Sequence, residues 1–180
     1  MKTLAPYQIF FPIGILSSLL AVGVWFTKDL NWFQAPAMLI HAKLIAGGFL
    51  WSFIIGFLMT AAPKMTGTNS AKTWELFIAL ALIFTQILSC WNIDARWFYG
   101  TTLILISFLI IFLGRRALSA KKSFPVFFFH VGIAIVLALL GSYYHFIGNS
   151  FMGIHLYHVG AVLLLVLGIG TRFFSFLSGL

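Results

Sequence analysis

The chain has 180 residues, of which 62% are hydrophobic and 8% charged, and its mean hydropathy is +1.07. Ordinary soluble domains carry roughly 25% charged residues, so this composition excludes a soluble fold. The formal net charge of +8 is better explained by cytoplasmic loops and anionic lipid headgroups than by nucleic acid, which we do not expect as a partner.

Apolar stretches separated by short polar interruptions predict an all-α bundle of six transmembrane helices. The first stretch is long enough to stay in the membrane, so no cleavable signal peptide is expected. The connections are too short to hold a soluble domain, and residues 1–180 should form a single membrane domain. The predicted spans are about 8–27, 37–62, 74–91, 97–114, 124–146 and 153–174.

The distribution of basic residues predicts the orientation, because cytoplasmic loops carry an excess of Lys and Arg. The N-terminal side, with the second, fourth and C-terminal connections, carries eight Lys and Arg residues against three on the opposite side. Both termini are therefore expected in the cytoplasm. Aromatic residues near the outer ends of their spans agree with this orientation: Trp25, Trp32, Trp91, Trp97, Tyr143, Tyr144 and Tyr157.

Four of the five histidines fall in the outer halves of the predicted spans. These are His41, His145, His155 and His158, whereas His130 lies in an inner half. His155 and His158 are three residues apart and share a helical face. Since neutral imidazole is the commonest metal ligand, this layer of histidines favours a metal or haem site.

A stripe of small residues runs down the second span from His41 through Gly48, Ser52 and Gly56, which share one sector at about 100° per residue. The stripe has two interpretations: close helix packing, or the wall of a groove that admits a flat macrocycle. Lys43 lies two residues after His41. It is expected to reach the outer surface, with pairing to a haem propionate or another anion as the alternative.

The remaining ionisable residues argue against several kinds of site. The three acidic residues, Asp29, Glu75 and Asp94, all fall at predicted span ends, so a carboxylate-based proton relay loses support. A single cysteine, Cys90, excludes an intrachain disulfide framework and a thiolate-rich metal site within one copy. Arg172 is expected to extend to the inner interface, and it could meet a haem only if the propionates pointed inward.

Two stretches, HAKLIAGGF and GFLMTAAPKMTG, resemble the N-terminal half of the NnrS family, polytopic bacterial membrane proteins associated with the nitric oxide response. The family pattern is roughly WHxHEMxxGF followed by GFLLTAxPxWTG. A later segment, GIGTRFFSF, places Arg172 near an arginine of the family. The second motif is matched by Gly56, Phe57, Leu58, Thr60, Ala61, Pro63, Thr66 and Gly67.

The resemblance implies a haem- and copper-containing protein that lowers nitrosative stress. The first motif departs from the family, because its second histidine is Lys43 here and its Glu and Met positions are Leu44 and Ile45. Typical members are about twice as long. This difference implies a half-size protein that pairs with another copy or with a second half-size subunit, or else a truncated member.

We therefore expect a haem-binding protein of the bacterial inner membrane that acts in the nitric oxide response, with nitric oxide as a ligand. Haem iron is expected on His41 and a histidine of the last span, with His158 preferred over His155 because it lies deeper, and the haem is expected to be lined by Gly48, Ser52, Lys43 and Arg172. If copper is bound as well, it would use His155, with His145 as the candidate second ligand. A b-type electron-transfer cytochrome and a cofactor-free scaffold or partner subunit remain alternatives.

Overall fold

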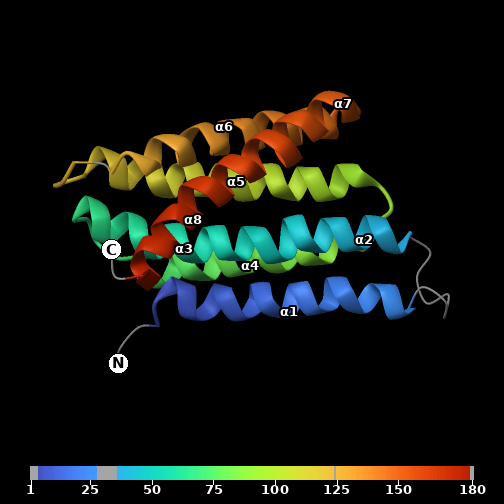
Figure 1. Cartoon of the computed structure of the whole chain (residues 1–180), viewed down its shortest axis with the longest axis horizontal. Helices are drawn as coiled ribbons and strands as arrows, with labels where there is room; N and C mark the ends of the chain where they lie inside the picture. The colour runs from blue at the N-terminus through green and yellow to red at the C-terminus, as the bar shows by residue number, and fades with distance from the viewer. Residues whose placement is uncertain (1–3, 28–35, 124, 179–180) are drawn as a thin grey trace.

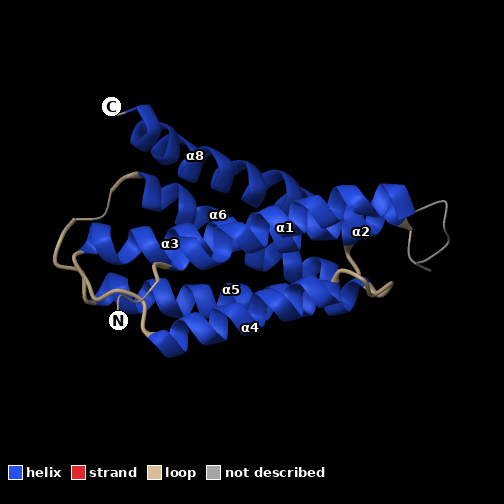
Figure 2. Cartoon of the chain, turned by 90° about the horizontal axis from the view of Figure 1, so that it is seen from below, coloured by secondary structure: helices blue, strands red, loops and turns tan. Residues whose placement is uncertain are grey.

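The computed structural model describes residues 4–27, 36–123 and 125–178, with side chains for all of these except 27 and 171–178. Every regular element in this part of the chain is helical, which confirms the all-α prediction. The helices run roughly alongside one another, and the loops gather at the two ends of the bundle (Figures 1 and 2).

The helical segments group into six rods, because two rods contain a π-helical stretch between α-helical ones. The first of these is formed by α2, η2 and α3, and the second by α7, η3 and α8. The segments are α1 Pro6–Thr27, α2 Ala37–Lys43, η2 Leu44–Leu50, α3 Trp51–Thr66, α4 Thr73–Ser89, α5 Ala95–Leu118, α6 Phe127–Phe146, α7 Ser150–Gly153, η3 Ile154–Ala161 and α8 Val162–Ser178.

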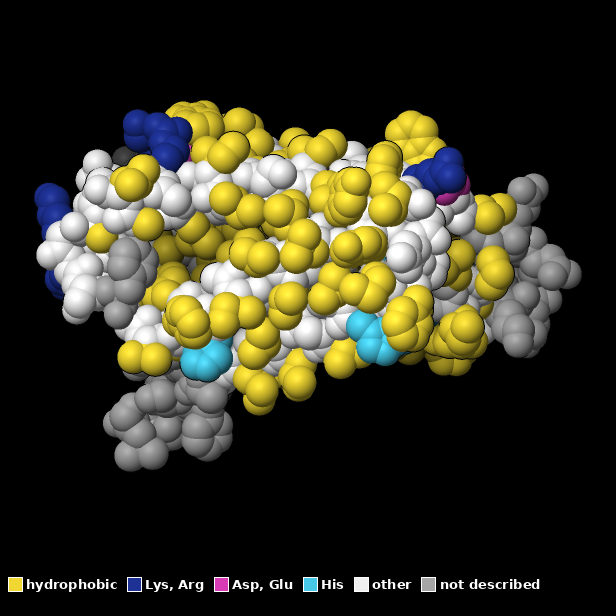
Figure 3. Space-filling view, turned by 90° about the horizontal axis from the view of Figure 1, so that it is seen from above, with side chains coloured by type: hydrophobic (Ala, Val, Ile, Leu, Met, Phe, Trp, Pro, Cys, Tyr) yellow, Lys and Arg dark blue, Asp and Glu magenta, His cyan; other side chains and the backbone are white. Residues whose placement is uncertain are grey.

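Five of the rods are long and apolar enough to cross a membrane, and α4, with 17 residues, is shorter. One face of the molecule carries hydrophobic side chains along its middle, with Lys and Arg side chains near its ends (Figure 3). Together these features show a helical bundle suited to a membrane. The predicted spans agree with the rods to within a few residues at most ends.

Local sequence explains where several helices begin and end. Gly67 adopts the left-handed conformation (φ 67°) after α3, and its N–H donates to the carbonyl of Pro63, as is common at helix C-termini. The α3 helix therefore continues past the predicted end at residue 62. Asp94 caps α5 and Asn149 caps α7, each accepting a backbone hydrogen bond from the first turn.

The two π-helical segments were not predicted. The η2 segment begins directly after Lys43, and η3 contains both His155 and His158. A π-helical turn takes in an extra residue and is found frequently at functional sites. Both segments thus lie at candidate ligands, and both change which residues share a helical face.

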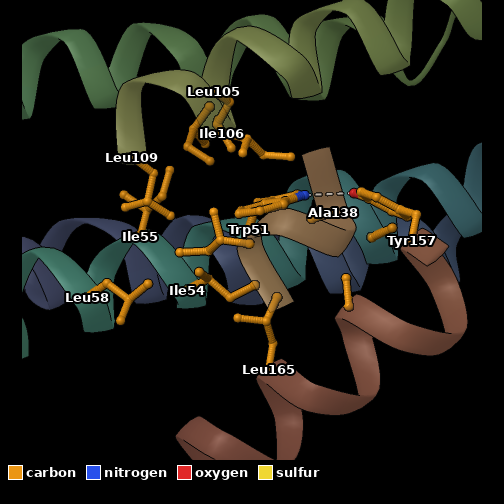
Figure 4. Close-up of a cluster of buried hydrophobic side chains, with 14 of the residues drawn as sticks. Trp51, Ile54, Ile55, Leu58, Leu105, Ile106, Leu109, Ala138, Tyr157 and Leu165 are labelled. Atoms are coloured by element: carbon orange, nitrogen blue, oxygen red, sulfur yellow. Dashed lines mark hydrogen bonds between the residues drawn. The ribbon is translucent and has the colours of Figure 1, made fainter. Parts of the chain in front are cut away.

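Trp51, the first residue of α3, is almost completely buried in the centre of the bundle. Aliphatic side chains from several helices surround its indole ring (Figure 4). Burial of this apolar surface and the close packing around it hold α3, α5, α6 and α8 together. The labelled aliphatic residues of this cluster are Ile54, Ile55, Leu58, Leu105, Ile106, Leu109, Ala138 and Leu165.

The stripe of small residues faces α1. A Cβ at Gly48 would lie 2.7 Å from the Cβ of Ser17, and one at Gly56 would lie 3.0 Å from the Cβ of Phe10. Ser52 is fully buried, and its hydroxyl has no hydrogen-bond partner among the described residues. These contacts support the helix-packing interpretation of the stripe, because α1 occupies the surface along which a macrocycle would have to lie.

Two glycines of α6 give a matched test of the packing. A Cβ at Gly141 would lie 2.5 Å from the backbone nitrogen of Tyr157, whereas one at Gly132 would meet nothing within 4 Å. We expect Gly141→Ala to destabilise the protein by about 1–3 kcal/mol through overpacking. Gly132→Ala should be neutral or stabilising by up to about 1 kcal/mol. Thermal unfolding in detergent measures both, and equal effects would contradict the close approach of α6 and η3.

Candidate metal-binding site

Two histidines and a tyrosine meet where the end of α6, the beginning of α5 and η3 come together. The rings of His145 and His158 lie 5.8 Å apart, centroid to centroid, in an edge-to-face arrangement. Tyr99 contacts both: its ring stacks on His145 at 3.9 Å, and its hydroxyl lies 3.3 Å from Nε2 of His158. Three segments that are distant in sequence thus form one polar cluster inside the bundle.

Two residues pack closely against the His145 ring. Tyr99 stacks on it with an interplanar angle of 5°, and Gly153 lies so close that a Cβ there would be 2.8 Å from Nε2. Nε2 is buried, and no described residue forms a hydrogen bond with it. An unsatisfied buried polar atom costs about 1–3 kcal/mol, so this nitrogen is a candidate for bonding to a group outside the chain.

A hydrogen bond beneath the cluster sets the position of His158. The indole N–H of Trp51 donates to the Tyr157 hydroxyl at 2.7 Å, and both side chains are almost completely buried (Figure 4). This bond ties η3 to the start of α3. Because Tyr157 directly precedes His158, the bond also determines how far η3 is inserted beside α6.

A polar layer joins α4 and α5 near the cluster. Gln86 donates to the Thr102 hydroxyl at 2.9 Å and accepts from the Thr101 hydroxyl at 2.7 Å. Lys43 is buried, and its ammonium group donates to the carbonyl of Asn92 at 2.7 Å, in the connection between α4 and α5. Lys43 therefore reaches the end of the bundle through the protein interior, where a loop carbonyl is its partner.

His41 lies against α1, away from this cluster. Its Nδ1 lies 2.9 Å from the carbonyl oxygen of Ala21, and its ring is 5.6 Å from that of Trp25. None of the described contacts joins His41 to His158. The predicted haem ligands thus have different neighbours, although α2, α7 and the end of α6 lie at the same end of the bundle (Figure 1).

His155 is exposed, and its Nδ1 lies 2.9 Å from the carbonyl oxygen of Phe151. The ring of His145 thus contacts that of His158, and none of the described contacts joins it to His155, the residue predicted to share copper with it. The side chain of Arg172 lies outside the described residues, as do Lys28 and Asp29 of the first connection.

The described residues contain no group of three or more His, Cys, Asp and Glu side chains placed to hold a metal ion. The cluster instead offers two imidazoles and the phenol of Tyr99. Imidazole nitrogens suit copper, zinc, iron and nickel. A complete centre would therefore need a further ligand, from Tyr99 or from outside this part of the chain.

Sequence reasoning missed three aromatic residues of the site: Trp51, Tyr99 and Tyr157. The enrichment of Trp and Tyr at membrane interfaces predicts an interfacial Tyr157, yet the structure buries it. The available signal was its position next to His158 on a span with two histidines. Counting at α-helical spacing does not show which residues share a face with Tyr157, because η3 is a π-helix.

One comparison with known proteins agrees with the motifs. A family model described as NnrS protein matches residues 3–179, nearly the whole chain. No curated protein and no solved structure matched the chain.

The bond between Trp51 and Tyr157 can be tested by removing one hydroxyl. Tyr157→Phe leaves the indole N–H buried without its acceptor, so we expect a loss of about 1–3 kcal/mol in the free energy of unfolding. Tyr143→Phe is the matched control, because Tyr143 lies on the same end of the bundle but is 51% exposed. Thermal unfolding followed by tryptophan fluorescence checks both. A Tyr157→Phe protein as stable as the control would show that the bond contributes nothing.

Proposed function

The chain belongs to the NnrS family, and from this membership we propose that it is an integral membrane protein of the nitric oxide response that binds a metal at His145 and His158. The family supports the biological role, and the half-buried pair of histidines supports the location of the site. We place the protein in the cytoplasmic membrane of a bacterium, as the family resemblance implies.

The observation that carries this proposal is the unpartnered Nε2 of His145. It is buried beside a second imidazole, and Tyr99 holds its ring in place by stacking. Metal ligands need a free nitrogen lone pair and a fixed ring orientation. The Nδ1 atoms of His41 and His155 lie against backbone carbonyls, which leaves the Nε2 atoms of these rings free as well. His145 differs from them because its free Nε2 is buried and its ring contacts a second imidazole.

Copper is the metal that we propose for this pair. Two imidazoles with an adjacent phenol match its preference for nitrogen ligands, and the Irving–Williams order ranks copper above the other divalent first-row metals. When bound, copper would supply a redox-active centre that can bind a small ligand such as nitric oxide. The chain itself orients His145 through Tyr99, positions His158 through Tyr157, and surrounds both with protein.

Haem binding is a separate proposal, and it requires a different set of ligands from the copper site. The described residues of one chain do not form the bis-histidine pair expected from His41 and His158, because these side chains contact different helices. The small-residue stripe is also packed against α1. We propose that a haem bound through His41 would lie between this chain and another copy or a second subunit, where the partly buried His41 can be reached.

For the membrane topology we propose six spans with both termini in the cytoplasm. At about 1.5 Å per residue, α4 is roughly 25 Å long, close to the hydrocarbon thickness. The α1 helix begins and α8 ends at the same end of the bundle (Figure 1). An even number of crossings places both termini on the same side of the membrane. The basic connections at that end of the bundle favour the cytoplasmic side.

The metal proposal predicts a specific set of losses. His145→Ala and His158→Ala should each lower copper affinity by at least about 10- to 100-fold, since even outer-shell partners of metal ligands contribute that much. Cells that express either variant should also recover more slowly from a nitric oxide donor than cells with the unchanged protein. Elemental analysis of purified protein, copper titration and growth curves measure these effects.

Two other histidines supply the controls for this experiment. His155 and His130 are both exposed, so His155→Ala and His130→Ala should leave copper binding unchanged. Loss of copper in the His155→Ala protein would instead support the pair of His155 and His145 expected from the sequence. A wild-type protein that binds no copper would refute the metal proposal.

Alkaline phosphatase fusions test the topology, because this enzyme is active only outside the cytoplasm. A fusion after Asn69, in the connection before α4, should be inactive, and one after Asn92, beyond α4, should be active. If both fusions behaved alike, α4 would not cross the membrane and the six-span arrangement would be wrong.

A further inference from the structure

An open surface cavity with a volume of about 150 Å³ lies at the end of the bundle opposite the histidine cluster. It is formed where the connection between α3 and α4 meets the last turn of α5. Its lining is polar with a net positive charge, and it consists of Thr68, Asn69, Lys72, Glu75, Arg115, Arg116 and Ser119.

Glu75 is already neutralised. Its two carboxylate oxygens accept hydrogen bonds from Arg116 at 2.7 and 2.6 Å, and Oε2 also accepts the backbone N–H of Lys72 at 2.8 Å. The pair is buried, with side-chain exposures of 4% for Glu75 and 8% for Arg116. Such a bidentate pair is geometrically specific, so Glu75 has little capacity to compensate further cations.

Two cations of the lining, among the described residues, form no salt bridge. The salt bridge of Arg116 and Glu75 is the only one among the described residues, so neither Lys72 nor Arg115 has an acidic partner there. Three cations and one carboxylate line the cavity. Lys and Arg are the usual ligands of phosphate groups, and this charge balance favours an anion.

Trp74 indicates where an anion would come from. Its ring is 47% exposed, and the guanidinium carbon of Arg115 lies 5.9 Å from the ring centroid. Tryptophans of membrane proteins are enriched at the level of the lipid headgroups. The cavity therefore faces the depth at which the phosphates of anionic lipids are found.

Further basic residues surround the same end of the bundle. Lys64 is exposed on α3, and the backbone N–H of Lys121 donates to the carbonyl of Thr66 at 2.8 Å. This bond brings Lys121 and Lys122 beside the connection between α3 and α4. The whole surface thus attracts anionic lipid, while the cavity offers a defined position for one phosphate.

We propose that this cavity binds the phosphate group of an anionic membrane lipid, with Lys72 and Arg115 as its charged ligands. The buried pair of Glu75 and Arg116 forms the rigid wall that holds the two ligands in place. Free phosphate shares the same chemistry, so the experiment separates the two sources.

Native mass spectrometry of the protein in detergent, with added dioleoyl phosphatidylglycerol or dioleoyl phosphatidylcholine, tests this site. The unchanged protein should retain phosphatidylglycerol preferentially. The double variant Lys72→Gln/Arg115→Gln should reduce that retention by about tenfold or more. The matched control, Lys64→Gln/Lys122→Gln, removes the same charge from the same end but outside the cavity, and it should retain the lipid.

A charge-preserving double variant distinguishes the loss of the two charges from misfolding. Lys72→Arg/Arg115→Lys should keep phosphatidylglycerol bound, and circular dichroism should show unchanged helix content in all variants. Equal loss of lipid in both charge-removing double variants, or no loss in either, would overturn the site. Stabilisation by inorganic phosphate that depends on Lys72 and Arg115, without any preference between the lipids, would overturn the lipid assignment.

Discussion

The structure depends on one constraint: polar groups within the spans must find partners inside the bundle, because lipid tails offer none. Helices satisfy the backbone, and side-chain bonds between helices satisfy the rest. The bond between Trp51 and Tyr157 joins α3 to η3, Gln86 and Thr102 join α4 to α5, and Arg116 and Glu75 join the opposite ends of the same two helices. Each bond therefore also determines which helices are neighbours.

Glycines make these contacts between helices sterically possible. At Gly141 and Gly153 any side chain would collide with Tyr157 and His145, respectively. Absence of a Cβ lets η3 and α7 approach α6 closely enough to bury the aromatic and imidazole rings. The glycines that permit close helix packing thus also allow the residues of the candidate metal site to come together.

Few buried polar atoms of the described side chains lack a hydrogen-bond partner. The described residues contain three buried side-chain nitrogen or oxygen atoms without a partner: Ser52 Oγ, Ser142 Oγ and His145 Nε2. Only the last is a good metal ligand, and it lies beside another histidine. The basic cavity at the other end of the bundle has a different chemistry. The protein thus separates a nitrogen-rich site from a phosphate-binding site along the length of its helices.

Length and hydropathy were sufficient to predict an all-helical membrane protein, and GFLMTAAPKMTG was sufficient to indicate its family. These features are local. An apolar run of about 20 residues has the length of a membrane-spanning helix, and Gly67 ends α3 through its own backbone conformation. Only the tertiary structure decided that His145 pairs with His158, that His41 faces α1, and that Tyr157 is buried. Those outcomes depend on lateral packing and on two π-helical segments, and neither leaves a readable period in the sequence.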